Sequence, residues 1–111
     1  MIYRATIVQS GTSNPVATPH APVMAIQPTW TRTAPGTFCA DFGGAIAPDK
    51  LFVLACPREF PDEPFWIKSA RLVNTPASPQ YLKAVEIRTA KVEDRTDCDN
   101  VEFYVEIRID A

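Results

Sequence analysis

The amino-acid sequence predicts an all-β fold: an antiparallel β-sandwich or jelly-roll-like barrel of about seven or eight strands. Short runs of β-branched and aromatic residues recur along the 111 residues, and one of them alternates apolar and polar side chains without a break. The 11 prolines and 4 glycines lie largely between these runs, where they favour turns. No run has the spacing of a long helix, and proline is excluded from helix interiors.

The composition indicates a single globular domain over residues 1–111. Apolar residues make up 46% and charged residues 22%, and a chain of 111 residues can bury one core. The net charge is −2 with both signs interspersed, so no basic stripe indicates a nucleic-acid partner. No apolar run approaches the length that spans a bilayer, so no membrane partner is expected either.

The first predicted strand is Ile2–Gln9. One face carries Tyr3, Ala5 and Ile7, and the other face is partly apolar as well, with Ile2 and Val8. Two apolar faces are typical of a strand in the middle of a sheet or at an oligomer contact. The segment lacks the basic start and apolar centre of a signal peptide, which favours folding in a cytoplasm.

A surface loop is predicted for Ser10–Pro22, which is rich in Gly, Ser, Thr, Asn and Pro. The short apolar segment Val23–Gln27 lies between Pro22 and Pro28. Proline removes a backbone donor, so this segment is expected to be an edge strand or extended coil.

A hairpin is predicted next, with strands Thr29–Thr33 and Thr37–Phe42 and a turn at Ala34-Pro35-Gly36. Its register can be argued from parity. A connection of three or five residues places the apolar side chains Trp30, Phe38, Ala40 and Phe42 on one face, whereas two or four residues would set Trp30 opposite Asp41. An odd loop with the aromatic face inward is therefore expected.

The hairpin is expected to end at Gly43-Gly44, and Pro48-Asp49-Lys50 to turn the chain into a strand, Leu51–Cys56. This strand is apolar on both faces. It is therefore expected to be among the most buried parts of the molecule.

Residues Pro57–Pro64 hold three prolines and are predicted to be a loop. The following segment, Phe65–Val73, is ambiguous. A helix capped by Asp62 would bring Phe65, Ser69 and Leu72 together, whereas a strand would group Phe65, Ile67, Ser69, Arg71 and Val73. Its aromatic and β-branched content favours the strand.

Three segments complete the chain after the loop Asn74–Gln80. A strand is predicted over Tyr81–Lys91, with Val85 and Ile87 on one face, and Glu93–Asn100 is a polar turn region. The last strand begins at Val101 and has the clearest pattern. Its apolar positions are Val101, Phe103, Val105, Ile107 and Ile109.

The three cysteines, Cys39, Cys56 and Cys98, are odd in number and form no CxxC pair, so zinc ligand spacing is absent. We expect three reduced thiols, two of them packed as small apolar side chains. A Cys39–Cys56 bridge between neighbouring strands is the alternative.

Catalytic chemistry is not indicated, and no catalytic residue is predicted. His20 is the single histidine, lies between prolines in a loop, and is accompanied by no G-x-S-x-G segment. A glycosidase needs two carboxylates on the walls of a cleft, whereas the acidic residues here lie in turns and on the outward face of the last strand. The chain is therefore not expected to be an enzyme.

Metal binding and sugar binding each have a candidate group of residues. The oxygen ligands Asp94, Asp97, Asp99 and Asn100 are grouped as in a calcium loop, but Arg95 lies among them and the EF-hand glycine is missing. We expect a solvated turn, with no metal and no cofactor. The aromatic residues Trp66, Trp30 and Tyr81 could stack on a sugar, although aromatic side chains in a small β protein more often lie in the core.

Several segments together resemble a known class of protein. The N-terminal ones are Tyr3-Arg4-Ala5, Gln9-Ser10-Gly11-Thr12 and Asn14-Pro15-Val16-Ala17-Thr18. Trp30-Thr31-Arg32 and Pro35-Gly36-Thr37-Phe38 then resemble a Trp-x-Arg, Gly-x-Tyr pairing, and Lys50-Leu51-Phe52-Val53 and Val105-Glu106-Ile107-Arg108-Ile109 agree in place and character. These features are similar to small β domains that recur among tailed-phage and prophage virion proteins. The sequence departs from them at Phe38, in its proline-rich loop from Asn14 to Pro28, and over Pro57 to Gln80.

The resemblance implies a structural component of a virion surface, such as a capsid decoration protein, a head fibre or a tail-fibre module. Its partners would be further copies of itself, for example in a trimer, and capsid or tail proteins. It would be made in the host cytoplasm and reside in the virion. A carbohydrate-binding or adhesion β-sandwich is the alternative.

Overall fold

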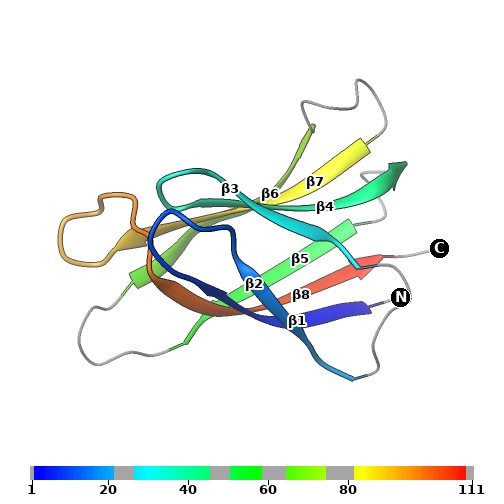
Figure 1. The fold of residues 1–111 in the computed structure, drawn as a ribbon, viewed down its shortest axis with the longest axis horizontal. Coiled ribbons are helices and arrows are strands. Elements are labelled where there is room, and N and C mark those ends of the chain that lie inside the picture. The colour runs from blue at the N-terminus through cyan, green and yellow to red at the C-terminus, as the bar shows by residue number, and fades with distance from the viewer. Residues whose placement is uncertain (1, 22–26, 46–50, 59–64, 75–81, 110–111) are drawn as a thin grey trace.

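A computed structural model describes residues 2–21, 27–45, 51–58, 65–74 and 82–109 of the chain. These residues form eight β-strands in two antiparallel sheets. The two four-stranded sheets lie face to face (Figure 1). Within these residues there is no helix. The predicted all-β fold and antiparallel sandwich are confirmed.

The first sheet has the strand order β2-β1-β8-β5 and the second has the order β3-β4-β7-β6. The strands of the first sheet are β1 (Ile2–Gln9), β2 (Val16–Pro19), β5 (Leu51–Pro57) and β8 (Val101–Ile109). Those of the second are β3 (Thr29–Ala34), β4 (Thr37–Ala45), β6 (Phe65–Asn74) and β7 (Leu82–Lys91). The predicted strands Ile2–Gln9, Tyr81–Lys91 and the C-terminal strand are thus confirmed, within a residue at their ends.

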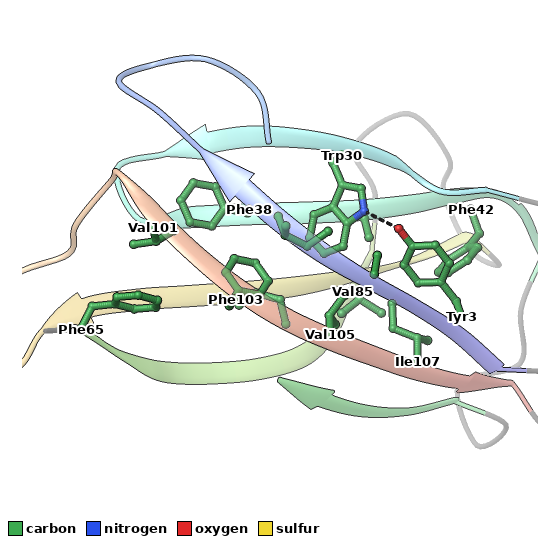
Figure 2. Packing of buried hydrophobic residues seen from close by; sticks show 14 of the residues in the cluster. Tyr3, Trp30, Phe38, Phe42, Phe65, Val85, Val101, Phe103, Val105 and Ile107 are labelled. Carbon is green, nitrogen blue, oxygen red and sulfur yellow. Dashed lines mark hydrogen bonds between the residues drawn. The ribbon is translucent and has the colours of Figure 1, made fainter. Parts of the chain in front are cut away.

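The core lies between the sheets and follows the alternation of their strands. Every second residue of β8 from Val101 to Ile107 is buried, and so are Tyr3, Ala5 and Ile7 of β1. Trp30 is 6% exposed, and its indole Nε1 donates a 3.2 Å hydrogen bond to the Tyr3 hydroxyl (Figure 2). This bond satisfies the one polar atom that burial of the indole ring removes from water.

The inward aromatic face of the β3–β4 hairpin is confirmed, but the predicted odd loop is wrong. Trp30 lies opposite Ala40 and Arg32 opposite Phe38, whereas Ala34 already pairs with Thr37. The connection is therefore a two-residue turn, and a β-bulge between Arg32 and Ala34 supplies the extra residue. A bulge changes the parity of the register as an odd loop would, so Trp30 still faces the core.

Strand β4 does not end at Gly43-Gly44, as predicted, but continues to Ala45. Its register against β7 shifts between Asp41 and Ala45. Glycine inside a strand is typical of such an irregularity, because it has no side chain that would have to pack on either face.

A strand also lies inside the segment that was predicted to be a loop. Residues Val16–Pro19 form β2, which pairs with β1 from Val8↔Val16 to Ala5↔Pro19. The loop was predicted from the prolines, but proline is excluded only from central strands and is compatible with an edge strand. Because β2 is the edge of its sheet, Pro19 can end it without a missing donor disturbing a second neighbour.

The prediction that Leu51–Cys56 is among the most buried segments is wrong. Strand β5 pairs with β8 and is the other edge of the first sheet. Val53 and Ala55 pack against the core, but Phe52 is 57% exposed and Leu54 is 61% exposed. The outward face of β5 is apolar without being covered.

Residues Phe65–Asn74 form strand β6, so the predicted strand is confirmed over the helix. The predicted grouping of its side chains holds only at its start. A register shift between Ile67 and Ser69 moves Leu72 onto the core side, and Arg71 is exposed. The extra residue of the bulge reverses the alternation.

The polar segment Glu93–Asn100 is a turn region, as predicted, with Arg95 and Asn100 at φ of 63° and 62°. Other predictions fall wholly or largely outside the described residues. They are the segment Val23–Gln27, the turn Pro48-Asp49-Lys50, the loops Pro57–Pro64 and Asn74–Gln80, and the ring of Tyr81.

Candidate interaction surfaces

One end of the sandwich is built around an ion pair between Arg32 and Asp99. The guanidinium Nε and Nη2 donate to the two carboxylate oxygens of Asp99 at 3.0 and 2.8 Å, and the Gly36 amide donates to the same carboxylate at 3.0 Å. These hydrogen bonds, led by that of Arg32, hold the pKa of Asp99 below its ordinary value. The pair joins β3 to the turn that precedes β8.

The turn at Gly36 contacts the β7–β8 connection directly. Its carbonyl accepts a 2.8 Å bond from the Thr89 amide, while the Thr89 hydroxyl donates to the Cys98 carbonyl at 2.8 Å. Gly36 has a φ of 64°, and a Cβ at this position would lie 2.6 Å from the Thr89 carbonyl oxygen. Only glycine fits this turn without displacing backbone.

The buried side chain of Gln9 holds a third loop at the same end. Its Nε2 donates to the carbonyls of Gly11 and Ser13 at 2.8 and 3.1 Å, and its Oε1 accepts from the Asn100 amide at 2.8 Å. The Asn100 side chain in turn accepts from the Gly11 amide at 2.8 Å. The polar groups at this end thus bind one another and fix the loops.

The acidic residues considered for calcium do not converge. Asp99 binds Arg32 and Asn100 binds Gly11, as described. Asp94 accepts from the Thr96 hydroxyl at 2.7 Å, and Asp97 accepts from Lys68 at 3.4 Å. Over the part of the chain that the structure describes, no group of three or more His, Cys, Asp or Glu side chains could hold a metal ion.

His20 is exposed and lies on the outward side of the first sheet. Its Nε2 is 2.7 Å from the Thr6 hydroxyl, and its ring meets that of Tyr104 edge-on with centroids 5.9 Å apart. The Thr6–His20 bond connects β1 to the end of β2. It extends the ladder in which the His20 amide bonds the Arg4 carbonyl at 2.8 Å.

All three cysteines carry free thiols, as expected, and the alternative Cys39–Cys56 bridge is not formed. Cys39 lies in β4 and Cys56 in β5, which belong to different sheets. Cys98 is buried, Cys39 is partly buried and Cys56 is exposed. Burial raises the pKa of the Cys39 and Cys98 thiols.

The outward face of the second sheet carries a compact charged cluster. Glu86 is 8% exposed and accepts from Arg71 at 3.0 Å and from Arg88 at 2.8 Å. The three residues come from the neighbouring strands β6 and β7. Both guanidinium groups donate to the same oxygen, Oε1, so the charges of this cluster are paired with one another.

The outward face of the first sheet is different, because its β5 edge is apolar. Phe52 and Leu54 lie beside Arg108 and Glu106 of β8, and the register pairs Phe52 with Arg108 and Leu54 with Glu106. These four residues and Val53 line a shallow hollow of about 170 Å³. We call this set the β5 patch.

A second hollow, of about 460 Å³, is lined by Trp66, Val92 and Arg95. Trp66 is 42% exposed and Val92 is 54% exposed. Of the aromatic residues considered for sugar stacking, Trp30 is buried in the core and Tyr81 lies outside the described residues. Trp66 is therefore the one described and exposed residue among the three considered for sugar stacking.

Sequence reasoning missed both the β5 patch and the Arg32–Asp99 pair. One signal pointed to the first of these: Pro57 closely follows the apolar run, and proline is confined to edge strands. The residues of the ion pair stand 67 positions apart, and no local pattern connects them.

No family model, no curated protein and no solved structure matches this chain. In the part that the structure describes, no helix is long and apolar enough to cross a membrane.

Proposed function

We propose that this protein is a non-enzymatic structural component of a virion surface, such as a capsid decoration, head-fibre or tail-fibre component. It acts through contacts with further copies of itself and with capsid or tail proteins. The observation that carries the proposal is the β5 patch, where Phe52 and Leu54 are 57% and 61% exposed on adjacent outward positions. Exposed apolar patches with polar rims mark protein–protein contacts.

The arrangement of the loops supports a structural role. At the end held by Gln9, Arg32 and Asp99, the polar side chains bond one another and hold the loops in place. The residues of the virion-like pattern serve the same purpose: Trp30 fills the core and Gly36 makes the close turn. Two of the residues that carry the resemblance therefore help to build the sandwich.

A repeated lattice suits a small contact patch. Many copies bound to one particle act together, so each single contact can be weak. A protein of this kind needs a stable fold and a contact face, and no catalytic group.

The test is to look for the chain in virus particles. Particles purified from cultures that carry its gene should contain it by mass spectrometry, and antibodies raised against the recombinant protein should label them in electron micrographs. Leu54→Glu should reduce its incorporation, whereas Val16→Glu, which places the same charge on a valine that is 67% exposed on β2, should not. Particles that lack the chain would contradict the proposal.

A carbohydrate-binding module is the second candidate, and the Trp66 hollow favours it. Its volume of about 460 Å³ is within the range of roughly 300–1,000 Å³ in which small-molecule sites fall. The half-exposed indole could stack on a sugar ring and Arg95 could bind its polar groups. Glycan-array binding by an isolated monomer, lost in Trp66→Ala, would favour this candidate over the virion protein.

A further inference from the structure

We propose that the β5 patch packs face to face against the same patch of a second copy, about a two-fold axis. This inference rests on the proposed function, because it names one of the partners and the surface that binds it. The contact is isologous: each residue of one copy meets a different residue of the other, and the same contact occurs twice.

The register of the first sheet defines the geometry. One row across the sheet holds Arg108 and Phe52, and the next outward row holds Glu106 and Leu54. A two-fold axis that lies in the interface, parallel to the rows and midway between them, exchanges the two rows. It sets Phe52 against Leu54 of the second copy, and Arg108 against Glu106 of the second copy.

The charges of the β5 patch complement those of a second copy. Arg108 is exposed and has no ion-pair partner among the described residues. Glu106 contacts Arg4 at 3.6 Å and the Tyr104 hydroxyl at 3.1 Å, and both contacts use Oε2. Among the described residues, its other oxygen, Oε1, has no partner, so it can accept from an arginine of the second copy. The two-fold axis creates two such ion pairs and two Phe–Leu contacts together.

The hollow of the β5 patch fits a side chain better than a ligand. Its volume of about 170 Å³ is below the roughly 300 Å³ at which small-molecule sites begin. Its lining combines apolar side chains with one acid and one base. An apolar side chain from a second copy, flanked by an ion pair, matches this lining.

Face-to-face packing of two copies would cover Phe52 and Leu54, whereas edge-to-edge pairing of their β5 strands would not. If β5 hydrogen-bonded to β5 of a second copy, Phe52 and Leu54 would remain on the outward face of a longer sheet, still in water. Stacked sheets lie about 10 Å apart, so outward side chains of both copies interdigitate. The face-to-face arrangement therefore removes both apolar side chains from solvent.

The experiment is sedimentation equilibrium of the full chain over a wide concentration range. We expect a reversible dimer for the wild type. Leu54→Glu should weaken it by about 30-fold or more, as expected for a central apolar contact. Arg108→Glu and Glu106→Arg should each weaken it, because each places like charges opposite each other. The double variant Arg108→Glu/Glu106→Arg should recover the dimer, because it restores the opposite pair with the charges exchanged.

The control is Val16→Glu, which places the same charge on an equally apolar position at the far edge of the same face. It should leave the dimer unchanged, and thermal melting followed by circular dichroism should show that every variant is folded. A wild type that stays monomeric, a trimer, or a double variant no stronger than its single variants would overturn the inference. A chain that occurs in virus particles and yet is monomeric would overturn this inference alone. A dimer that is absent from particles would overturn only the proposed virion role.

Discussion

Gly36→Ala tests how closely the turn at Gly36 approaches the backbone of Thr89 and Cys98. An alanine there must adopt a φ of 64°, which costs about 1–2 kcal/mol for a residue with a Cβ. The new Cβ would also lie 2.6 Å from the Thr89 carbonyl oxygen and 2.8 Å from the Cys98 amide nitrogen. Both are backbone atoms in hydrogen bonds, so relief requires the turn to move away, at a further cost of about 1–3 kcal/mol. The free energy of unfolding should fall by about 2–5 kcal/mol.

Gly11→Ala is the matched control, since it isolates the backbone strain from the overlap. Gly11 has a φ of 57°, and a Cβ added there would meet nothing within 4 Å. This variant should therefore lose only the conformational part, about 1–2 kcal/mol.

The assay is urea unfolding followed by tryptophan fluorescence, with both variants and the wild type measured together. The midpoints give the changes in the free energy of unfolding when the slopes agree. If Gly36→Ala loses no more stability than Gly11→Ala, the turn does not pack against Thr89 and Cys98 as described, and the reasoning is refuted.

Three further predictions concern the core, an ion pair and the thiols. Trp30→Ala should lower the free energy of unfolding by about 3–5 kcal/mol, because the indole is 6% exposed; a loss below about 1 kcal/mol would show that it is not packed in the core. Asp99→Asn should cost about 2 kcal/mol at pH 7. Because the pKa of Asp99 is lowered in the folded state, the extra stability of the wild type over Asp99→Asn should be complete at neutral pH and shrink from about pH 5 downward. Free energies from urea unfolding whose difference does not change with pH would contradict this. With a thiol reagent at pH 8, Cys56 should react quickly and Cys98 only on unfolding, and the reverse order would contradict their described burial.

Local patterns in the sequence determined much of this fold. The unbroken alternation from Val101 predicted β8 and its core face, because that periodicity requires no knowledge of the rest of the chain. The inward position of Trp30 was also predictable, since opposing it to Asp41 would place a carboxylate among aromatic rings. The means by which the chain achieves this, the bulge before Ala34, has no signature in the sequence.

The predictions for β5 and β2 were wrong because the structure of each segment depends on the strands that lie beside it. Apolar side chains on both faces of β5 are compatible with burial and with an uncovered edge, and only the strand order distinguishes the two. Likewise β2 is a strand because β1 offers it an edge, although its own residues favour a loop. Arg32 lies in β3 and Asp99 in the turn before β8, and their pairing follows from the assembled sandwich.

The position of β1 has a consequence for the order of folding. Its long partner is β8, and the ladder between them runs from Ile2↔Arg108 to Gln9↔Val101. The first and the last strands of the described chain thus lie side by side in the middle of one sheet (Figure 1). During synthesis β1 cannot pair with β8 until β8 has been made, and its apolar face stays exposed until then. The β3–β4 hairpin, in contrast, can form as soon as its two strands have been made. Such non-local pairing slows folding, so we expect the second sheet to form first and to serve as the surface on which the first sheet is completed.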